Sequence, residues 1–304
     1  MSRAPVAAIF PGHVADGSFM QQGHEGARDA CARLGLPLRV IDGVPLAALE
    51  AALAQAAEAG AGLVLAQGGQ CEAAATAVAR RFPTLRFVVV QGHGTAPNLH
   101  AYRAAQEQSA FLAGAAAGLM IARGVVGHVS GIRPRPGLLA RAAFAAGIAH
   151  VAPEVRLLSI FTGDQDDAAR GAEAAERLAA AGARLIFTML NAAQAAVMEV
   201  ARRHRIALVG DGHDWVARHP GLFQLAAVAD TGGVMAAAID DYAANRRPRG
   251  EEVVFGLATP EIVRLACGDA VPGFVRAAVA VIAEALREGR LGIAETASIE
   301  ELSP

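Results

Sequence analysis

The sequence has few aromatic residues and no excess of either charge. Aromatic residues make up 5% of the 304 residues, whereas 54% are hydrophobic, many of them alanine. Such small aliphatic side chains favour packed helices. The 27 Lys+Arg against 29 Asp+Glu give a net charge of -2. This balance argues against a nucleic-acid binder, which usually has a strongly basic face. The high hydrophobic content and low net charge argue against a disordered chain. The length suits about two domains.

Long apolar runs and paired cysteines are also missing. The run around Phe111 to Arg123 falls short of the roughly 20 residues that span a bilayer, so we expect no membrane span. Cys31, Cys71 and Cys267 are far apart, which leaves neither metal spacing nor a complete disulfide framework. No leader pattern follows Met1. We expect a cytoplasmic protein if Met1 is the native start, and a periplasmic or membrane-anchored one if a leader has been removed.

Short apolar runs alternate with helical patterns along the chain. Runs of about five apolar residues between helices predict parallel strands covered on both faces. The expected strands are 6–10, 38–41, 62–66, 86–90, 125–129, 156–161, 184–190, 206–210, 223–228 and 253–257. The expected helices include 18–34, 46–59, 71–82, 106–123, 137–150 and 274–288. We therefore predict an α/β protein.

The pattern restarts after the helix at 106–123, which indicates two lobes of similar size with a cleft between them. We assign 1–122 plus about 232–250 to lobe 1, and about 123–231 plus 251–304 to lobe 2. The polar segment 245–250 is the break before the final part, where we expect one strand and one helix. Ligands in such folds bind at the carboxyl ends of the strands, so the loops there are the places to search.

Two familiar cofactor patterns fail in these loops. Gly92-His93-Gly94 and Gly210-Asp211-Gly212 each follow a strand, but both lack the third glycine and the helix that place a pyrophosphate. Tight turns explain them better. His213 and Asp214 lie beside Asp211, yet the chain has no HExxH helix and no Cys/His cluster. We therefore predict no cofactor and no metal.

A nucleophilic enzyme is the next alternative. Cys71 opens a helix after Gly68-Gly69-Gln70, where the helix dipole would lower the pKa of a thiol. No GxSxG elbow and no fixed His/Asp partner accompany it. A buried small apolar residue is the simpler interpretation of Cys71. We predict no catalytic residue.

The segment from Asp16 to Gln22 leads into the first helix and carries Phe19, one of few aromatic residues. Taken alone, Asp16 and Ser18 are good N-cap residues, and Phe19 suits a hydrophobic staple. Cap and staple is therefore the first interpretation, and ligand contact the second.

A family resemblance changes this balance. Asp16-Gly17-Ser18-Phe19-Met20-Gln21-Gln22-Gly23-His24-Glu25-Gly26 resembles the DxSFNQ…G signature of the basic membrane protein family, which are nucleoside-binding lipoproteins of ABC transporters. Weaker similarities follow in order at 79–87, 97–114, 126–131 and 209–211. The resemblance covers roughly residues 6 to 290. It implies a type I periplasmic binding protein fold, with two doubly wound parallel-sheet lobes, a hinge and a central cleft.

The resemblance also implies roles for single residues. The family stacks a purine between two aromatic rings, of which Phe19 matches the first, and Phe161 is the best candidate for the second. Trp215 is the other candidate for this second ring. Asp16 lies in the family's ligand loop, and Asp211 matches the acid that holds the ribose hydroxyls, where a carboxylate makes strong hydrogen bonds.

Three polar contacts of the family are changed in this chain. Met20 replaces an asparagine, Gln91 replaces the acid after the fourth strand, and Val228-Ala229-Asp230 offers no ribose-contacting lysine. These changes favour a free nucleobase or another flat heterocycle over an ordinary nucleoside. Arg103 and Arg133 lie near the expected site and suit an acidic group on the ligand.

We therefore expect a non-enzymatic solute-binding protein that closes on a small heterocycle and delivers it to an ABC permease. A cytoplasmic ligand sensor of the same fold, and an enzyme acting on a heterocycle, are the alternatives. The expected ligand-binding residues are Asp16, Ser18, Phe19, Met20, Gln91, Arg103, Phe161, Asn191, Asp211 and Trp215.

Overall fold

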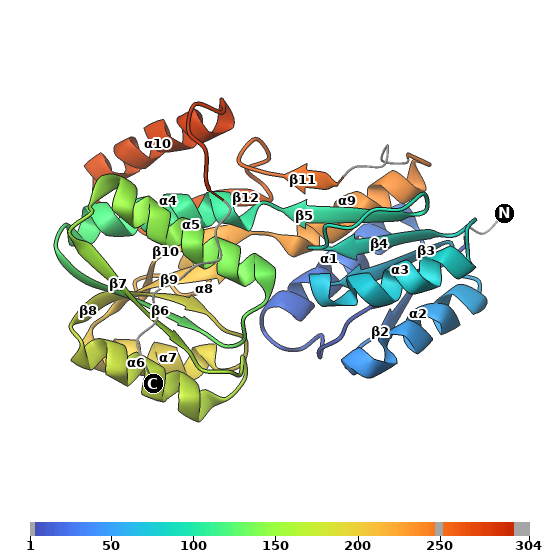
Figure 1. The fold of residues 1–304 in the computed structure, drawn as a ribbon, viewed down its shortest axis with the longest axis horizontal. Coiled ribbons are helices and arrows are strands. Elements are labelled where there is room, and N and C mark those ends of the chain that lie inside the picture. Colours follow the sequence, from blue (N-terminus) through green and yellow to red (C-terminus); the bar gives the residue numbers. More distant parts are fainter. Residues whose placement is uncertain (1–3, 247–251, 295–304) are drawn as a thin grey trace. The chain divides into compact units, whose positions relative to one another are not determined.

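The computed structural model describes residues 4–246 and 252–294. It divides into two compact units (Figure 1). Unit 1 runs to Ala104 and resumes from Asp230 to Phe255, whereas unit 2 comprises Ala105–Ala229 and continues from Gly256. Among the described residues, the chain thus passes between the units at 104/105, 229/230 and 255/256.

Unit 1 is a six-stranded parallel sheet with helices on both faces. Its strand order is β11-β5-β4-β3-β1-β2. The elements are β1 (Val6–Ile9), α1 (Phe19–Leu34), β2 (Leu38–Ile41), η1 (Leu46–Ala48), α2 (Leu49–Glu58), β3 (Leu63–Gln67), η2 (Gly69–Cys71), α3 (Glu72–Arg81), β4 (Arg86–Val90), β5 (Leu99–Ala104), α9 (Thr231–Ala243) and β11 (Val253–Phe255).

Unit 2 repeats this design with one antiparallel edge strand. Its order is β12-β10-β9-β8-β6-β7, and β12 runs antiparallel to β10. The elements are α4 (Gln106–Ile121), β6 (Gly124–Ser130), α5 (Arg135–Val151), β7 (Val155–Phe161), α6 (Ala168–Ala180), β8 (Ala183–Met189), α7 (Gln194–His204), β9 (Ala207–Gly212), α8 (Trp215–Arg218), β10 (Phe223–Ala229), β12 (Val263–Cys267) and α10 (Gly273–Arg287).

The cores follow from the apolar strands. In unit 1, buried residues of β1, β3 and β4 pack with α2 and α3 on one face, for example Ile9, Val64 and Val78. The other face is covered by α1 and α9, which touch along their length. In unit 2, β6, β8 and β10 pack with α6 and α7. Continuous burial of short strands such as Leu63–Gln67 is what a sheet covered on both faces requires. The predicted doubly wound fold is confirmed.

Several predicted boundaries differ from the observed ones. Helix α4, expected in lobe 1, lies in unit 2, where it packs against α5 and β10. Strand β11, expected in lobe 2, pairs with β5 of unit 1. The final part holds two strands instead of one, because β12 was missed. Residues 247–250 of the predicted polar break lie outside the described residues.

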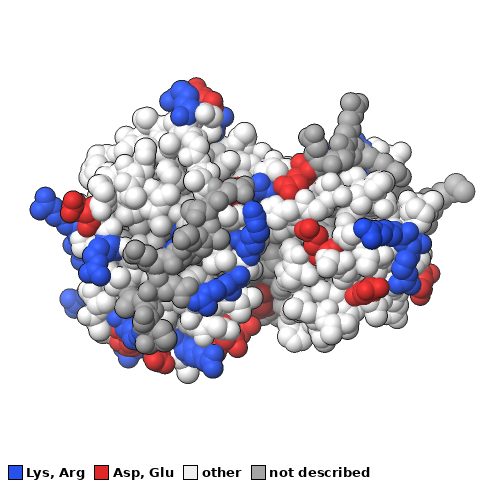
Figure 2. All heavy atoms as spheres, in the orientation of Figure 1, with Lys and Arg blue, Asp and Glu red and all other residues white. Residues whose placement is uncertain are grey.

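Figure 2 shows basic and acidic side chains interspersed on the viewed face, with uncharged surface between them. This distribution agrees with the nearly balanced composition, in which basic and acidic residues almost cancel.

Candidate functional site

Both units have a topological switch point at the carboxyl edge of the sheet. In unit 1, β1 lies between β2 and β3, and in unit 2, β6 lies between β7 and β8. Successive connections leave such a strand in opposite directions, so the loops there open a crevice for ligands. Nearly all the predicted site residues lie at these edges.

The loop between β1 and α1 is organised by Asp16. Its carboxylate accepts hydrogen bonds from the backbone N–H of Ser18 at 2.8 Å, Met20 at 3.1 Å and Gln21 at 3.1 Å. The negative charge also suits a helix N-terminus. Ser18 is the N-cap residue, but its side chain makes no capping bond. Asp16 thus holds the loop that presents Phe19.

Phe19 is the first residue of α1, and it is half-buried. Within 4–246 and 252–294, no aromatic ring or guanidinium group stacks on its ring. Met20 points the other way: it is 8% exposed, and a Cβ on Gly12 would lie 3.1 Å from its Cγ. The ring of Phe19 is therefore not covered by another ring or guanidinium group of the described residues, whereas Met20, predicted as a contact, is a core residue.

Gln91 is also placed differently from the prediction. It follows β4 with a left-handed backbone, φ 61°, which is uncommon for a residue other than glycine. Its side-chain amide accepts a hydrogen bond from Ala104 N–H at 2.8 Å and donates to the Ala104 carbonyl at 3.4 Å. The Gln91 side chain thus pairs with the backbone of Ala104, the last residue of β5, in the way that a neighbouring strand would.

Arg103 is engaged at the edge of the sheet. Its Nε donates to Glu252 at 3.0 Å, and His93 Nδ1 lies 3.0 Å from the other oxygen of that carboxylate. The backbone N–H of His93 donates to Glu72. Glu252 therefore balances Arg103, which reduces the attraction of this arginine for an anionic ligand.

Three loops of unit 2 are fastened to one another. Thr162 and Gly163 donate backbone hydrogen bonds to Ser130 and Gly131, and Asn191 donates to the Gln165 carbonyl. A Cβ on Gly131 would lie 2.6 Å from Gln165 N, so glycine permits this close approach. The ends of β6, β7 and β8 are thereby held together.

Phe161 lies at this junction, half-buried at the end of β7. The guanidinium carbon of Arg133 lies 4.3 Å from its ring centroid, a cation–π contact. The ring of His128 is 5.5 Å away in an edge-on arrangement. Burial and the charge of Arg141 lower the pKa of His128 well below its usual value, so this ring is neutral.

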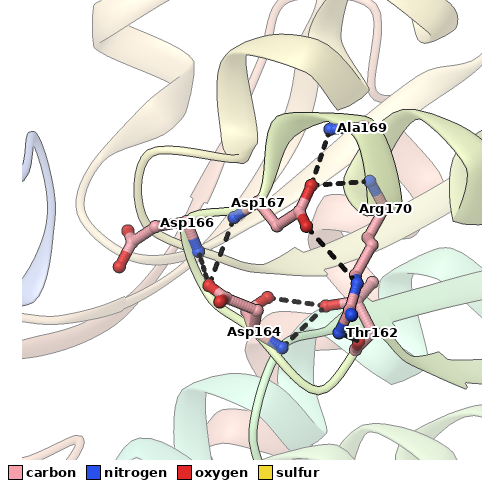
Figure 3. Close-up of polar contacts among 6 residues, drawn as sticks. All are labelled: Thr162, Asp164, Asp166, Asp167, Ala169 and Arg170. Carbon is pink, nitrogen blue, oxygen red and sulfur yellow. Dashed lines mark hydrogen bonds and ion pairs between the residues drawn. The ribbon is translucent and has the colours of Figure 1, made fainter.

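The acidic loop after Phe161 is an internally hydrogen-bonded turn (Figure 3). Asp164 accepts from the N–H groups of Asp166 and Asp167, while Asp167 caps α6. The Asp166 carboxylate points away from this turn in Figure 3 and accepts from Ala192 N–H. Over the described residues, no group of three or more His, Cys, Asp or Glu is arranged to hold a metal ion.

Two polar side chains at the edge of unit 2 have unused hydrogen-bonding capacity. The amide of Asn191, a half-buried residue, makes no side-chain hydrogen bond to the described part of the chain. Asp211 Oδ1 is buried and has no partner there. Burial raises the pKa of Asp211 to about 7, against a backbone hydrogen bond from Gly212 that lowers it. Both side chains are suited to ligand contact.

Trp215, predicted as a possible stacking residue, belongs to the core. It is 8% exposed, and its ring stacks on Phe223 at 5.1 Å and His219 at 5.7 Å. Its Nε1 donates to the Asp211 carbonyl. Both the polar edge and the aromatic faces of the indole are thus occupied within the core.

Cys71 is not an activated nucleophile. It is fully buried, and burial raises the pKa of its thiol to about 12, so the thiolate is not populated at neutral pH. The interpretation of Cys71 as a small core residue is therefore supported.

Sequence reasoning missed Gln67, Gln22 and Thr231, which form a buried polar cluster beside Phe19. A glutamine at the end of the otherwise apolar run Leu63–Ala66 was the available signal. It also missed His128, a fully buried histidine within the apolar strand β6.

With both edges described, the family can be assigned. A family model for "ABC transporter substrate-binding protein PnrA-like" matches residues 4–273. The chain belongs to this family. The resemblance to the basic membrane protein family is thereby confirmed.

A purine-binding protein from Brucella abortus (strain 2308) is 28% identical over 156 residues. The match spans 51% of this chain and 44% of that protein, so less than half of the relative's length is covered.

Solved structures show the same fold. A solute-binding protein of an Aeropyrum pernix K1 ABC transporter system has a TM-score of 0.84 at 17% identity, covering 95% of this chain and 92% of that one. One from Conexibacter woesei DSM 14684 has 0.76 at 24%, covering 96% and 99%. A transcriptional activator of the comK gene from Bacillus halodurans has 0.81 at 13%, covering 94% and 99%. At these identities the likeness shows the fold alone.

Among the described helices, none combines the length and hydropathy needed to cross a bilayer.

Proposed function

We propose that this substrate-binding protein captures a flat heterocycle of the purine base class. Phe19 in unit 1 and Phe161 in unit 2 carry the proposal, because each presents a half-buried ring at the carboxyl edge of its own sheet. Stacking on aromatic rings suits a flat heterocycle and contributes about 1 kcal/mol beyond burial. The name of the Brucella relative, a purine-binding protein, supports the same ligand class.

A base is favoured over a nucleoside because polar groups expected to contact a ribose are missing from the carboxyl edges of the two sheets. Gln91 is engaged by Ala104, Met20 is buried, and the chain contains no lysine at all. The contacts that the family resemblance leads us to expect for a ribose are therefore reduced to Asp211. A base lacks the ribose hydroxyls, so it buries fewer polar groups of the ligand without a partner.

Asp211, Asn191 and Arg133 provide the polar recognition in this proposal. Asp211 Oδ1, which has no partner among the described residues, accepts from the ribose hydroxyls if a nucleoside binds and from a single ring or exocyclic N–H if a base binds. The Asn191 amide pairs with a neighbouring donor or acceptor. Arg133, which lies over Phe161, favours a base with a carbonyl-rich or anionic edge. The ligand takes the place of Arg133 on the ring or adds to that stack.

Delivery of the unchanged ligand to an ABC permease completes the proposal, with the protein periplasmic or membrane-anchored. A cytoplasmic sensor and an enzyme are the competing functions. Recovery of chemically unchanged ligand after prolonged incubation supports binding without turnover, and appearance of a product would support the enzyme.

A thermal-shift screen tests the ligand class. Adenine, hypoxanthine, xanthine, their nucleosides, pyrimidine bases and ring-opened purine catabolites are each added in excess. A ligand at a hundredfold excess over its Kd stabilises the folded state by about 2.7 kcal/mol. We expect the largest shift with a purine base. No shift with any of them would overturn the proposed ligand class.

Asp211→Ala distinguishes bases from nucleosides. If both classes bind, we expect this change to weaken a nucleoside more than its base, because the ribose hydroxyls lose their acceptor. Equal losses, measured by calorimetry, would remove the ribose role of Asp211.

A further inference from the structure

A polar cluster lies in the interior of unit 1, directly beneath Phe19. Gln67 is 0% exposed, Thr231 2% and Gln22 9%. Burying an amide costs free energy unless its polar atoms are hydrogen-bonded. Hydrogen bonds between β3, α1 and α9 offset part of this cost, although Gln67 Oε1 has no hydrogen-bond partner among the described residues.

The hydrogen bonds form a continuous series. Gln67 Nε2 donates to the carbonyl oxygen of Phe19 at 3.0 Å and to Thr231 Oγ1 at 3.2 Å. Thr231 in turn donates to Gln22 Oε1, from its backbone N at 3.0 Å and from its hydroxyl at 2.8 Å. The main chain of Phe19 is thus connected through one side chain to the start of α9.

Two glycines in α1 make room for this arrangement. A Cβ on Gly23 would lie 2.6 Å from Gln67 Cδ, and a Cβ on Gly26 would collide with the Gly232 carbonyl of α9. Glycine within a helix costs about 1 kcal/mol relative to alanine. The helix that begins with Phe19 therefore keeps unfavourable residues at the two places where Gln67 and α9 approach it.

The position of Thr231 gives the cluster a second property. The chain re-enters unit 1 at Asp230, and Thr231 follows it as the first residue of α9. The same amide that fixes the Phe19 carbonyl thus also fixes the point of re-entry. A rotation of the Phe19 main chain, or a shift of the chain where it re-enters unit 1, would each alter a hydrogen bond of the Gln67 amide.

We propose that Gln67 is a positioning residue for ligand binding, which sets the orientation of the Phe19 ring through the Phe19 carbonyl and ties it to the re-entry of the chain at Thr231. This proposal rests on the proposed function of Phe19 as a stacking residue. It predicts that loss of the Gln67 N–H groups loosens the Phe19 side chain before any ligand is added.

Asn98 supplies the matched control, because it is a buried amide with a purely structural environment. Its Nδ2 donates to the carbonyls of Ala79, Phe82 and Leu85, each at 2.9 Å. It precedes β5, at the opposite edge of the same sheet from Phe19. Removing its donors costs stability in unit 1 without touching the cluster.

The first experiment uses the full chain labelled with fluorinated phenylalanine, without ligand. The Phe19 fluorine signal is assigned by its loss in Phe19→Leu. We expect one narrow signal in the parent and in Asn98→Leu, and a broadened, split or shifted signal in Gln67→Met. In Gln67→Glu the parental signal should return on acidification, because a protonated carboxyl regains one donor. An unchanged Phe19 signal in Gln67→Met would overturn the proposal.

The second experiment measures adenine affinity by calorimetry in a double-mutant cycle. We expect Gln67→Met to weaken binding about tenfold and to have little further effect in the Phe19→Ala background, since it acts through Phe19. Asn98→Leu should lower the melting temperature and leave affinity unchanged. Additive losses from Gln67→Met and Phe19→Ala would overturn the positioning role. Absence of adenine binding by the parent would instead contradict the proposed ligand, and the fluorine signals still decide the role of Gln67.

Discussion

Gln91 and Asp211 occupy corresponding places in the two units and have opposite hydrogen-bonding states. Gln91 follows β4, which lies beside β3, and Asp211 lies near the end of β9, which is beside β8. The Gln91 amide is paired with the backbone of Ala104, whereas Asp211 Oδ1 has no partner among the described residues. The comparison teaches that one sheet edge uses this place to hold its own chain, whereas the other keeps a buried carboxylate oxygen there with no partner among the described residues.

The two candidate stacking residues also differ in the contacts that hold them. Phe19 is held by the Asp16 cap and by the buried amide of Gln67. Phe161 is held by backbone hydrogen bonds between the loops that follow β6 and β7. Unit 1 thus places its ring with side chains, which point mutations can remove, and unit 2 with main-chain contacts, which they cannot.

The largest stability effect is expected from Gln91→Glu. A carboxylate still accepts from Ala104 N–H but repels the Ala104 carbonyl, and it places a charge in a buried position. We expect a loss of about 2 kcal/mol in the free energy of unfolding at pH 8, measured by urea denaturation. A loss below a few tenths would mean that the Gln91–Ala104 pairing is unimportant.

The next largest effect is expected from Phe19→Ala. We expect it to reduce the affinity for a purine base at least tenfold, which is about 1.4 kcal/mol. The fold should be retained because the ring is only half-buried. Phe161→Ala should give a similar loss if both units contribute a ring. Phe82→Ala, a half-buried phenylalanine after α3, is the control and should leave affinity unchanged. Equal affinity in Phe19→Ala and the parent would remove Phe19 from the site.

We expect Asp211→Asn to raise the free energy of unfolding, whereas Gln91→Glu lowers it. The pKa of Asp211 is about 7 in the folded chain against an ordinary 3.8, so the folded state binds the extra proton. This group's contribution to stability therefore falls as pH rises from about 4 to about 7. We expect the variant to be more stable by about 1 kcal/mol at pH 8, with the gain shrinking towards pH 5. A gain independent of pH would contradict the raised pKa.

The smallest effect is expected from Asp167→Ala, which removes the N-cap of α6. Its carboxylate accepts from Ala169 and Arg170 N–H but is partly exposed. We expect a loss of roughly 0.5 to 1 kcal/mol in thermal or urea unfolding, without a change in affinity. A strong loss of affinity would show that the loop after Phe161 depends on side chains, as the Phe19 loop does.

The sequence predicted most elements within a few residues. The helix expected at 18–34 is observed as Phe19–Leu34, and the strands at 38–41 and 86–90 match their observed bounds. Strand β12 was missed because Val263–Cys267 is short, half-buried and antiparallel at an edge, so its apolar pattern is weak. The predicted assignment of α4 to lobe 1 was wrong, because no local sequence pattern tells which sheet a helix will cover.

The sequence by itself determined the fold class, the family and the loop that bears Phe19, because strand and helix periodicity and a contiguous motif are local properties. Only the tertiary structure decided which side chains are available. It buried Met20 and Trp215 in the core and paired Gln91 with Ala104 and Arg103 with Glu252. It left Asp211 Oδ1 without a partner among the described residues. Burial and hydrogen-bond partners come from residues distant in sequence, so they exist only once the sheets have assembled.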